Sequence, residues 1–104
     1  MKIPPYEALQ LFKAIKREGL YQTDHFQMRA MERGFTMEDV FEVADNGDIS
    51  KRSPTYKAKH KDWSYTMIGK DIDGERITIV FAVTSDREVK LITGYRGKYK
   101  GKYR

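Results

Sequence analysis

The chain has 104 residues and a formal net charge of +5, which is the length of one domain and leaves no room for a second core. Hydrophobic residues make up 39% of the chain, enough for a modest core and too many for a wholly disordered protein. The lack of cysteine excludes disulfides, zinc ribbons and thiol catalysis. The chain has no signal-peptide segment and no apolar run of ~20 residues, so we expect a cytoplasmic protein with no membrane contact.

Three helices are expected in the first half of the chain. Over residues 5–18 apolar side chains recur at intervals of three and four, which is the spacing of one helix face. Residues 24–33 and 37–46 have the polar starts and glycine ends that are typical of two further helices. The expected caps are Thr23 or Asp24 and then Thr36, and the helices end before Gly19, Gly34 and Gly47.

The second half of the chain has the period-two alternation of strands. Asp73-Gly74 lies between two such stretches and predicts a hairpin turn. The expected strands are residues 48–53, 63–72, 75–84 and 88–96. Three helices followed by an antiparallel meander predict an α+β domain, with the N-terminal helices packed on one face of a small antiparallel sheet.

We expect one domain over residues 1–95, in which residues 1–19 form an additional N-terminal helix, and a flexible basic tail over residues 96–104. The tail repeats itself as Gly97-Lys98-Tyr99-Lys100 and Gly101-Lys102-Tyr103-Arg104. Lysine binds phosphate, and a tyrosine ring stacks on a base with ~1–3 kcal/mol where a base is bound. A flexible terminus that only keeps the protein in solution is the alternative interpretation.

Positive charge is concentrated in two stretches. Residues 51–61 and 96–104 each contribute five positive charges and no negative one. The rest of the chain is net acidic, with a concentration of carboxylates over residues 38–48. A divided surface charge steers a polyanion to one face, so RNA is the expected partner. The alternative is that the basic stretches are simply a solvated loop and tail.

The most distinctive local pattern runs from His25 to Gly34. On a helix, His25 and Arg29 are four residues apart, and Glu32 and Arg33 follow one turn later. An imidazole, a guanidinium group and a carboxylate therefore share one broad helix face. A structural histidine and a surface ion pair between glutamate and arginine are the alternative interpretations.

These residue types suit cleavage of RNA through its own 2′-hydroxyl, which needs a base, an acid and cations over the phosphorane, and no metal. Histidine titrates near neutrality and acts as base or acid. Arginine stays charged and offers forked donors, so Arg29 or Arg33 is expected to hold the scissile phosphate. Thr93 and Tyr95 point to one side of the last strand, close to Arg96. Tyr95 is expected to stack on a base, orient the phosphate or transfer a proton.

No metal or other cofactor is expected. The chain has two histidines and no clustered histidine–carboxylate spacing. It also has no Walker loop and no dinucleotide-binding fingerprint. Trp63 begins an expected strand, which favours sheet packing over a role as a platform for base stacking.

The segment from His25 to Val40 resembles the N-terminal signature of DUF4258, a family of small bacterial proteins of unknown function that is grouped with the RelE-like and BrnT-like toxins. The residues that carry this resemblance are His25-Phe26, Arg29, Glu32-Arg33-Gly34-Phe35-Thr36 and Asp39-Val40. Later features agree with it: Asn46-Gly47-Asp48-Ile49, the apolar strand over residues 77–83, and Ile92-Thr93-Gly94-Tyr95. The match runs from Thr23 to Tyr95, and its N-terminal motif is more specific than its strands.

The resemblance implies a RelE-like fold of the ribonuclease-toxin kind and a gene that is paired with an antitoxin. It also implies cleavage of mRNA, either free or on the ribosome. The positions that match the family pattern are His25, Arg29, Glu32, Arg33, Thr93 and Tyr95. Base and acid stay unassigned among them, because RelE-like members vary at their active sites.

Our first hypothesis is therefore a metal-independent endoribonuclease toxin, an mRNA interferase, held in check by a cognate antitoxin that covers the cationic face with an acidic segment. The expected catalytic residues are His25, Arg29, Glu32 and Tyr95. The expected RNA-binding residues are Arg33, Lys51, Arg52, Lys57, Lys59, Thr93, Arg96, Lys98, Lys100 and Lys102.

Two other functions fit the same sequence. The first is a module without enzymatic activity, in which the cationic face binds RNA or a ribosomal surface without cutting. The second is a protein-interaction subunit whose contact surface is the acidic helix near residues 38–48. Salt-dependent binding without cleavage products favours the module.

Overall fold

A computed structural model describes residues 1–15, 17–58 and 62–96, with Arg17 and Lys57 described by their backbone only. It shows an α+β fold, as the sequence predicts. The elements, in chain order, are α1 (Pro5–Ala14), the 3₁₀ turn η1 (Arg17–Gly19), β1 (Leu20–Gln22), α2 (Asp24–Arg33), α3 (Met37–Asn46), β2 (Asp48–Ile49), β3 (Thr55–Lys57), β4 (Asp62–Lys70), β5 (Arg76–Ser85) and β6 (Glu88–Arg96).

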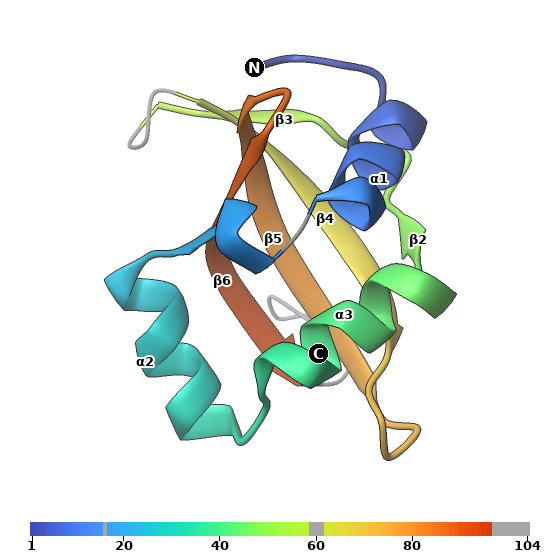
Figure 1. The fold of residues 1–104 in the computed structure, drawn as a ribbon, viewed down its shortest axis with the longest axis vertical. Coiled ribbons are helices and arrows are strands. Elements are labelled where there is room, and N and C mark those ends of the chain that lie inside the picture. Colours follow the sequence, from blue (N-terminus) through green and yellow to red (C-terminus); the bar gives the residue numbers. More distant parts are fainter. Residues whose placement is uncertain (16, 59–61, 97–104) are drawn as a thin grey trace.

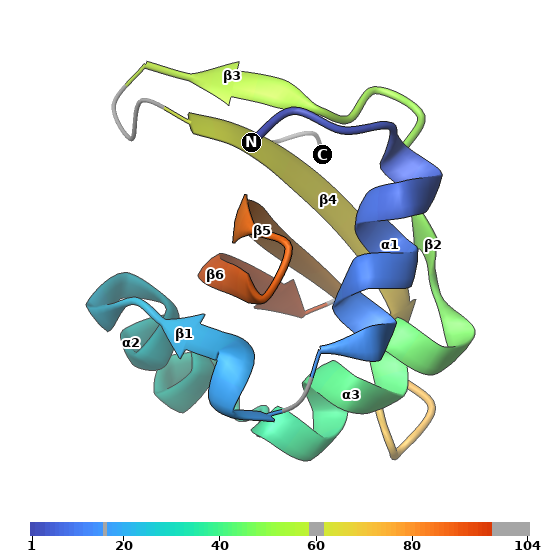
Figure 2. The same cartoon turned by 45° about the horizontal axis from the view of Figure 1, so that its top comes forward.

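The strands form one sheet in the order β1-β6-β5-β4-β2, and β3 pairs with the opposite end of β4 (Figures 1 and 2). β1 runs parallel to β6, and every other pairing in the described chain is antiparallel. Short edge strands limit the length of unpaired backbone at a sheet margin, and here β1 has only three residues. The centre of the sheet is the meander β4-β5-β6.

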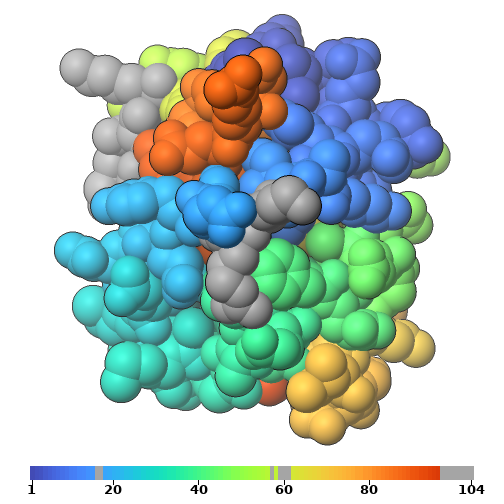
Figure 3. Space-filling view, viewed as in Figure 1, coloured from blue at the N-terminus to red at the C-terminus, as the bar shows by residue number. Residues whose placement is uncertain are grey.

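The core lies between this sheet and the helices. Alternate residues of β5 (Ile77, Ile79, Phe81 and Val83) are fully buried, and Phe81 packs edge-on against Phe12 of α1 at 4.8 Å. The blue, cyan and green segments that contain α1, α2 and α3 cover much of the face seen in the space-filling view (Figure 3). The face of the sheet that points away from the core is called the rear face below; its residues on β4, β5 and β6 include Ser64, Thr66, Ile68, Lys70, Arg76, Thr78, Val80, Ala82, Lys90, Thr93 and Tyr95.

The two central helices begin and end where their caps predict. Thr23, rather than Asp24, caps α2 by accepting a hydrogen bond from the amide of Phe26 at 3.0 Å. Thr36 and Asp39 form a complete capping box at the start of α3. Gly34 ends α2 in the left-handed region at φ 69°, a conformation that glycine adopts without steric cost.

The first helix is shorter than its apolar period predicts. α1 ends at Ala14, because Ile15 already has extended backbone angles (φ −73°, ψ 138°). The chain then passes through η1 into β1, a strand that no pattern in the sequence predicts. A strand of three residues carries too little alternation to be recognised, and its partner β6 lies about 70 residues further along the chain.

The second half of the chain contains one further unpredicted strand, β3, inside the basic stretch 51–61. The predicted strand at residues 48–53 is reduced to Asp48–Ile49. The three long strands are in place with ends shifted by at most two residues, and the predicted hairpin turns at Gly74 with φ 83°. Arg96 belongs to β6, so of the predicted tail only residues 97–104 follow the domain, and these lie outside the described residues.

The N-terminal helix is part of the core. Ala8, Leu9 and Phe12 of α1 are buried. Before the helix, the phenol of Tyr65 accepts a hydrogen bond from the amide of Ile3 at 2.6 Å and donates one to its carbonyl at 2.7 Å. α1 therefore closes the core over β4 and β5.

This role of α1 predicts a large effect of Phe12→Ala. Truncating a fully packed phenylalanine leaves a cavity and costs about 3–5 kcal/mol of the free energy of unfolding. Tyr6, on the same helix but 69% exposed, supplies the matched control Tyr6→Ala. Urea unfolding of both variants measures the difference, and equal stability of the two would contradict the packing of α1.

Candidate functional site

A one-residue bulge sets the direction of the side chains at the end of β6. Phe81 pairs with Leu91, and the next residue of β5, Val80, pairs with Thr93, so that Ile92 is the extra residue. Because Leu91 faces the core beside Phe81, Thr93 and then Tyr95 face the rear of the sheet. The structure thus brings these two predicted site residues onto one face.

Thr93 has a buried hydroxyl without a partner. Only 7% of the residue is exposed, and its Oγ1 makes no hydrogen bond within the described chain. Native proteins pair nearly all buried polar atoms, so an unpaired one calls for a structural or functional explanation. Its neighbours across the sheet are Val80 and Thr66.

Tyr95 meets α2 through Arg33. The Arg33 guanidinium carbon lies 5.2 Å from the centre of the Tyr95 ring, and its Nη1 donates to the carbonyl of Gly94 at 2.6 Å. β1 covers the edge of β6 only over residues 89–91, so α2 can reach the edge beyond it. A cation over an aromatic face is mutually stabilising, and it fixes both side chains.

Gly94 allows this close approach of α2 and β6. A Cβ atom added at Gly94 would lie 2.6 Å from the ring of Phe35, which follows α2. Phe35 in turn packs edge-on against Phe26 of α2 at 5.8 Å. The glycine between Thr93 and Tyr95 therefore fixes α2, with its arginines, against the strand that carries the hydroxyls.

The other predicted residues of α2 extend the site along the helix. His25, Arg29 and Arg33 follow one another at intervals of four residues and lie along one side of α2. Arg29 forms an ion pair with Glu32 at 2.7 Å. His25 is exposed in the first turn, and eight residues separate it from Arg33, which is about 12 Å along the helix axis. The three side chains form a row rather than a single cluster.

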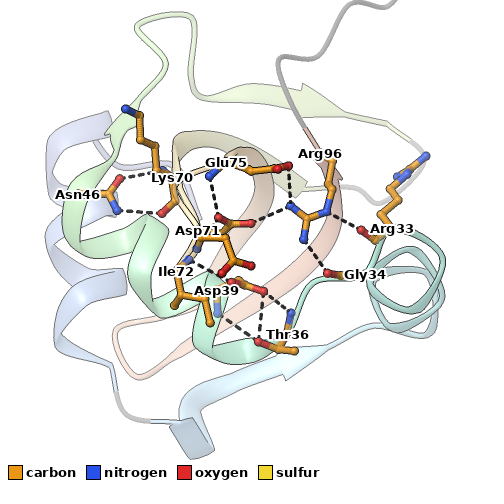
Figure 4. A network of polar contacts seen from close by, with 11 residues as sticks. Arg33, Gly34, Thr36, Asp39, Asn46, Lys70, Asp71, Ile72, Glu75 and Arg96 are labelled. Carbon is orange, nitrogen blue, oxygen red and sulfur yellow. Dashed lines mark hydrogen bonds and ion pairs between the residues drawn. The ribbon is translucent and has the colours of Figure 1, made fainter.

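The RNA-binding role expected of Arg96 needs a guanidinium group that is open to solvent. In the structure this group is instead engaged in contacts within the chain. Its guanidinium group donates to Asp71 Oδ2 at 2.7 Å, to the carbonyl of Arg33 at 2.7 Å and to the carbonyl of Gly34 at 2.6 Å (Figure 4). Glu75 Oε1 lies 3.7 Å away. Arg96 thereby joins the end of β6, the C-terminal end of α2 and the β4–β5 turn.

Asp71 organises that turn. Its side chain is fully buried, and its Oδ1 accepts the amides of Asp73 and Glu75 at 2.9 and 2.8 Å. The hydrogen bond from Arg96, aided by these amides, lowers the pKa of Asp71 although burial acts in the opposite direction. The same pair raises the pKa of Arg96.

The predicted basic residues outside α2 and β6 are only partly described. Lys51 and Arg52 are exposed in a turn before β3, and the backbone of Lys57 ends β3. Lys59, Lys98, Lys100 and Lys102 lie outside the described residues. Trp63, which we expected to pack on the sheet, meets the ring of Tyr56 at 5.3 Å and the ammonium group of Lys2 at 4.6 Å.

Two cations near the site were not predicted. Lys70 and Arg76 are directly opposite each other on β4 and β5, and both are exposed on the rear face. The signal that identifies them is the strand register, since their sequence context is a common hairpin. Once Asp73-Gly74 is taken as the turn, pairing outward from it brings the two together.

The described ranges 1–15, 17–58 and 62–96 contain no group of three histidine or acidic side chains able to hold a metal ion, and no helix in them is long and apolar enough to span a membrane.

In a comparison with known families, residues 22–96 match a domain of unknown function, DUF4258. The chain belongs to the DUF4258 family. Neither a curated protein nor a solved structure matches it. The DUF4258 segment contains α2, α3 and the whole meander, whereas α1 precedes it.

The Arg96–Asp71 pair predicts a specific loss of stability in acid. Because the pKa of Asp71 is lower in the folded chain than in the unfolded one, its contribution is fully present above about pH 4 and is lost as the pH falls further. Asp71→Asn should lower the melting temperature by about 5–10 °C at pH 7, and the difference from the wild type should shrink below pH 4. Thermal unfolding between pH 3 and 7 measures it.

Asp73→Asn is the matched control, since Asp73 is exposed in the same turn. Its melting curve should follow that of the wild type at every pH. A difference between Asp71→Asn and the wild type that is the same at pH 3 and pH 7 would refute the role of the Asp71 carboxylate.

Proposed function

We propose that this chain is the toxin of a toxin–antitoxin pair and that it cleaves mRNA as a metal-independent endoribonuclease. One observation supports the proposal most: the row His25, Arg29 and Arg33 on α2 ends against Tyr95, on the same strand face as the unpaired hydroxyl of Thr93. Imidazole, guanidinium and phenol groups are the acid–base and phosphate-binding groups that this reaction uses.

The proposed reaction is a transesterification within the RNA. A base removes the proton of a 2′-hydroxyl, and the 2′-oxygen attacks the adjacent phosphorus atom. The bond from phosphorus to the 5′-oxygen breaks, and an acid gives that oxygen a proton. The products are a 2′,3′-cyclic phosphate and a 5′-hydroxyl end. The nucleophile comes from the substrate, so the reaction needs no metal.

The row on α2 suggests where the phosphate binds. Residues four apart on a helix are about 5–6 Å apart at Cβ, so a phosphate beside Arg29 is within reach of His25 on one side and Arg33 on the other. In this arrangement His25 transfers a proton and both arginines stabilise charge on the phosphorane. Glu32 fixes Arg29 through their ion pair. Tyr95 and Thr93 orient the neighbouring nucleotide.

The proposed RelE-like relationship supplies the partner. A cognate antitoxin would cover the row on α2 and the Thr93–Tyr95 face with acidic residues, in the cytoplasm where mRNA is translated. Exposed Lys51 and Arg52, with the basic residues beyond the described ranges, would extend the contact to the RNA backbone.

A second function, binding of RNA or a ribosomal surface without cleavage, is favoured by the distance within the row. His25 lies about 12 Å along α2 from Arg33, whereas an acid and a base that act on one phosphate must both be within hydrogen-bond reach of it. If Tyr95 and Arg33 mark the phosphate, His25 is too distant to act on it.

Induced expression separates these functions. The wild-type chain should stop growth and fragment mRNA, and His25→Ala and Arg33→Ala should each restore growth and leave mRNA intact, because one loses the proton-transfer group and the other a cation on the phosphate. Growth curves and the integrity of total mRNA are the measurements. Fragments should carry 2′,3′-cyclic phosphate ends and should form in the presence of a chelator.

Lys13→Ala is the control, since Lys13 is exposed on α1 and lies outside the proposed site. Soluble wild-type protein at high level with normal growth and intact mRNA would rule out the endoribonuclease. Full toxicity of both site variants would reject the row on α2 as its catalytic centre.

Deleting residues 97–104 tests the proposed role of the basic tail. Deletion should begin after Arg96, because Arg96 holds the domain together. The loss of four positive charges (Lys98, Lys100, Lys102 and Arg104) should weaken binding to single-stranded RNA at least tenfold at low salt and flatten its dependence on salt. Unchanged affinity in a titration, with an unchanged melting temperature, would show that the tail does not bind RNA.

A further inference from the structure

Lys70 and Arg76 place two positive charges side by side. In the register of β4 and β5 they are directly opposite each other, next to the turn. Cross-strand neighbours have their Cβ atoms about 4.5–5.5 Å apart, and like charges at this position destabilise the sheet. A hairpin selected only for stability would have a neutral or oppositely charged residue at one of the two positions.

Neither cation is neutralised within the described chain. Both side chains are exposed, and neither takes part in an ion pair among the described residues. They line a cleft of about 660 Å³ together with the carboxylates of Glu42, Asp48 and Asp71. Asp71 is paired with Arg96, and Glu42 and Asp48 form no ion pair to Lys70 or Arg76. These carboxylates reduce the local potential but leave the donors of Lys70 and Arg76 available to a ligand.

The backbone that carries this pair is held in place on both sides. Asn46, the last residue of α3, accepts the amide of Lys70 at 2.8 Å and donates to its carbonyl at 2.9 Å (Figure 4). Beside Arg76, the turn is held by Asp71, which accepts the amides of Asp73 and Glu75 and is itself held by Arg96. The two cations therefore start from fixed backbone positions, which lowers the entropy lost when they bind a ligand.

The pair also lies next to the proposed site. Thr78 is directly opposite Tyr95, so Arg76, two residues before Thr78, is the diagonal neighbour of Tyr95 on the rear face. Such diagonal neighbours are about 7–8 Å apart. Arg33 lies over the Tyr95 ring, so cations approach Tyr95 both from α2 and from the β4–β5 hairpin.

We infer that Lys70 and Arg76 form a second phosphate-binding subsite, which holds the RNA strand one or more nucleotides away from the phosphate at α2. The inference rests on the proposed function. A phosphate bridging the two side chains relieves their repulsion, so bound RNA stabilises a pair that is unfavourable in the free protein. A polynucleotide presents several phosphates in a row and can occupy both subsites at once, which a mononucleotide cannot do.

This arrangement predicts opposite effects on binding and on stability. In Lys70→Gln/Arg76→Gln, affinity for single-stranded RNA should fall about tenfold at low salt. The negative slope of log K against log salt should become less steep by about 1.4, or 0.7 for each lost contact. The melting temperature of the free protein should rise by about 2–4 °C, because the like-charge repulsion is gone. A substitution that merely damaged the fold would lower affinity and melting temperature together.

The matched control is Lys13→Gln/Arg87→Gln, which removes the same charge from two exposed positions, one on α1 and one in the β5–β6 turn. A 20-nucleotide single-stranded RNA without secondary structure serves as the probe, over a range of salt concentrations. Affinity, salt slope and melting temperature that match this control would overturn the subsite while leaving the proposed function in place. If the wild type shows no salt-dependent binding to RNA, the proposed function fails, and the subsite with it.

Discussion

The contact between Arg96 and Asp71 holds together the parts of the molecule that form the candidate site. One guanidinium group reaches a buried carboxylate in the β4–β5 turn and the two carbonyls that end α2. Removing either charge would leave the other without its partner in a partly buried position, which costs more than an exposed ion pair contributes. The position of α2 relative to β6, and so that of Arg33 relative to Tyr95, depends on this contact.

The same contact explains why the site combines residues from distant segments. α2 supplies the row of His25, Arg29 and Arg33, β6 supplies Thr93 and Tyr95, and the hairpin supplies Lys70 and Arg76. These three elements meet around Arg96, whose own side chain points to the helix side of the sheet beside Ile77. An arginine that looked like the start of a basic tail is thus a structural residue.

Local signals in the sequence predicted the helices and long strands well, because caps, glycines and alternation act over a few residues. Thr36 with Asp39, and Gly34 at the end of α2, gave boundaries that the structure confirms. β1 was missed because it is held by pairing to β6 rather than by its own three residues. The row on α2 followed from helical spacing, and the shared face of Thr93 and Tyr95 from alternation. The contact of Arg96 with Asp71 depends on tertiary structure, and the pairing of Lys70 with Arg76 depends on strand register. Neither can be predicted from a short stretch of sequence.

The extra residue in β6 has a consequence for how this strand can vary. Before Ile92 the odd-numbered residues Val89 and Leu91 face the core, and after it the even-numbered Gly94 and Arg96 do so. The strand therefore has two halves in opposite phase, joined at one position. If the strand paired without its bulge, so that Ile92 rather than Thr93 lay opposite Val80, the hydroxyls of Thr93 and Tyr95 would turn into the apolar core and the Arg96 side chain would point to the rear, away from Asp71. The bulge at Ile92 is thus required by folding and by the site together, whereas a change of length in the β5–β6 turn would disturb neither phase.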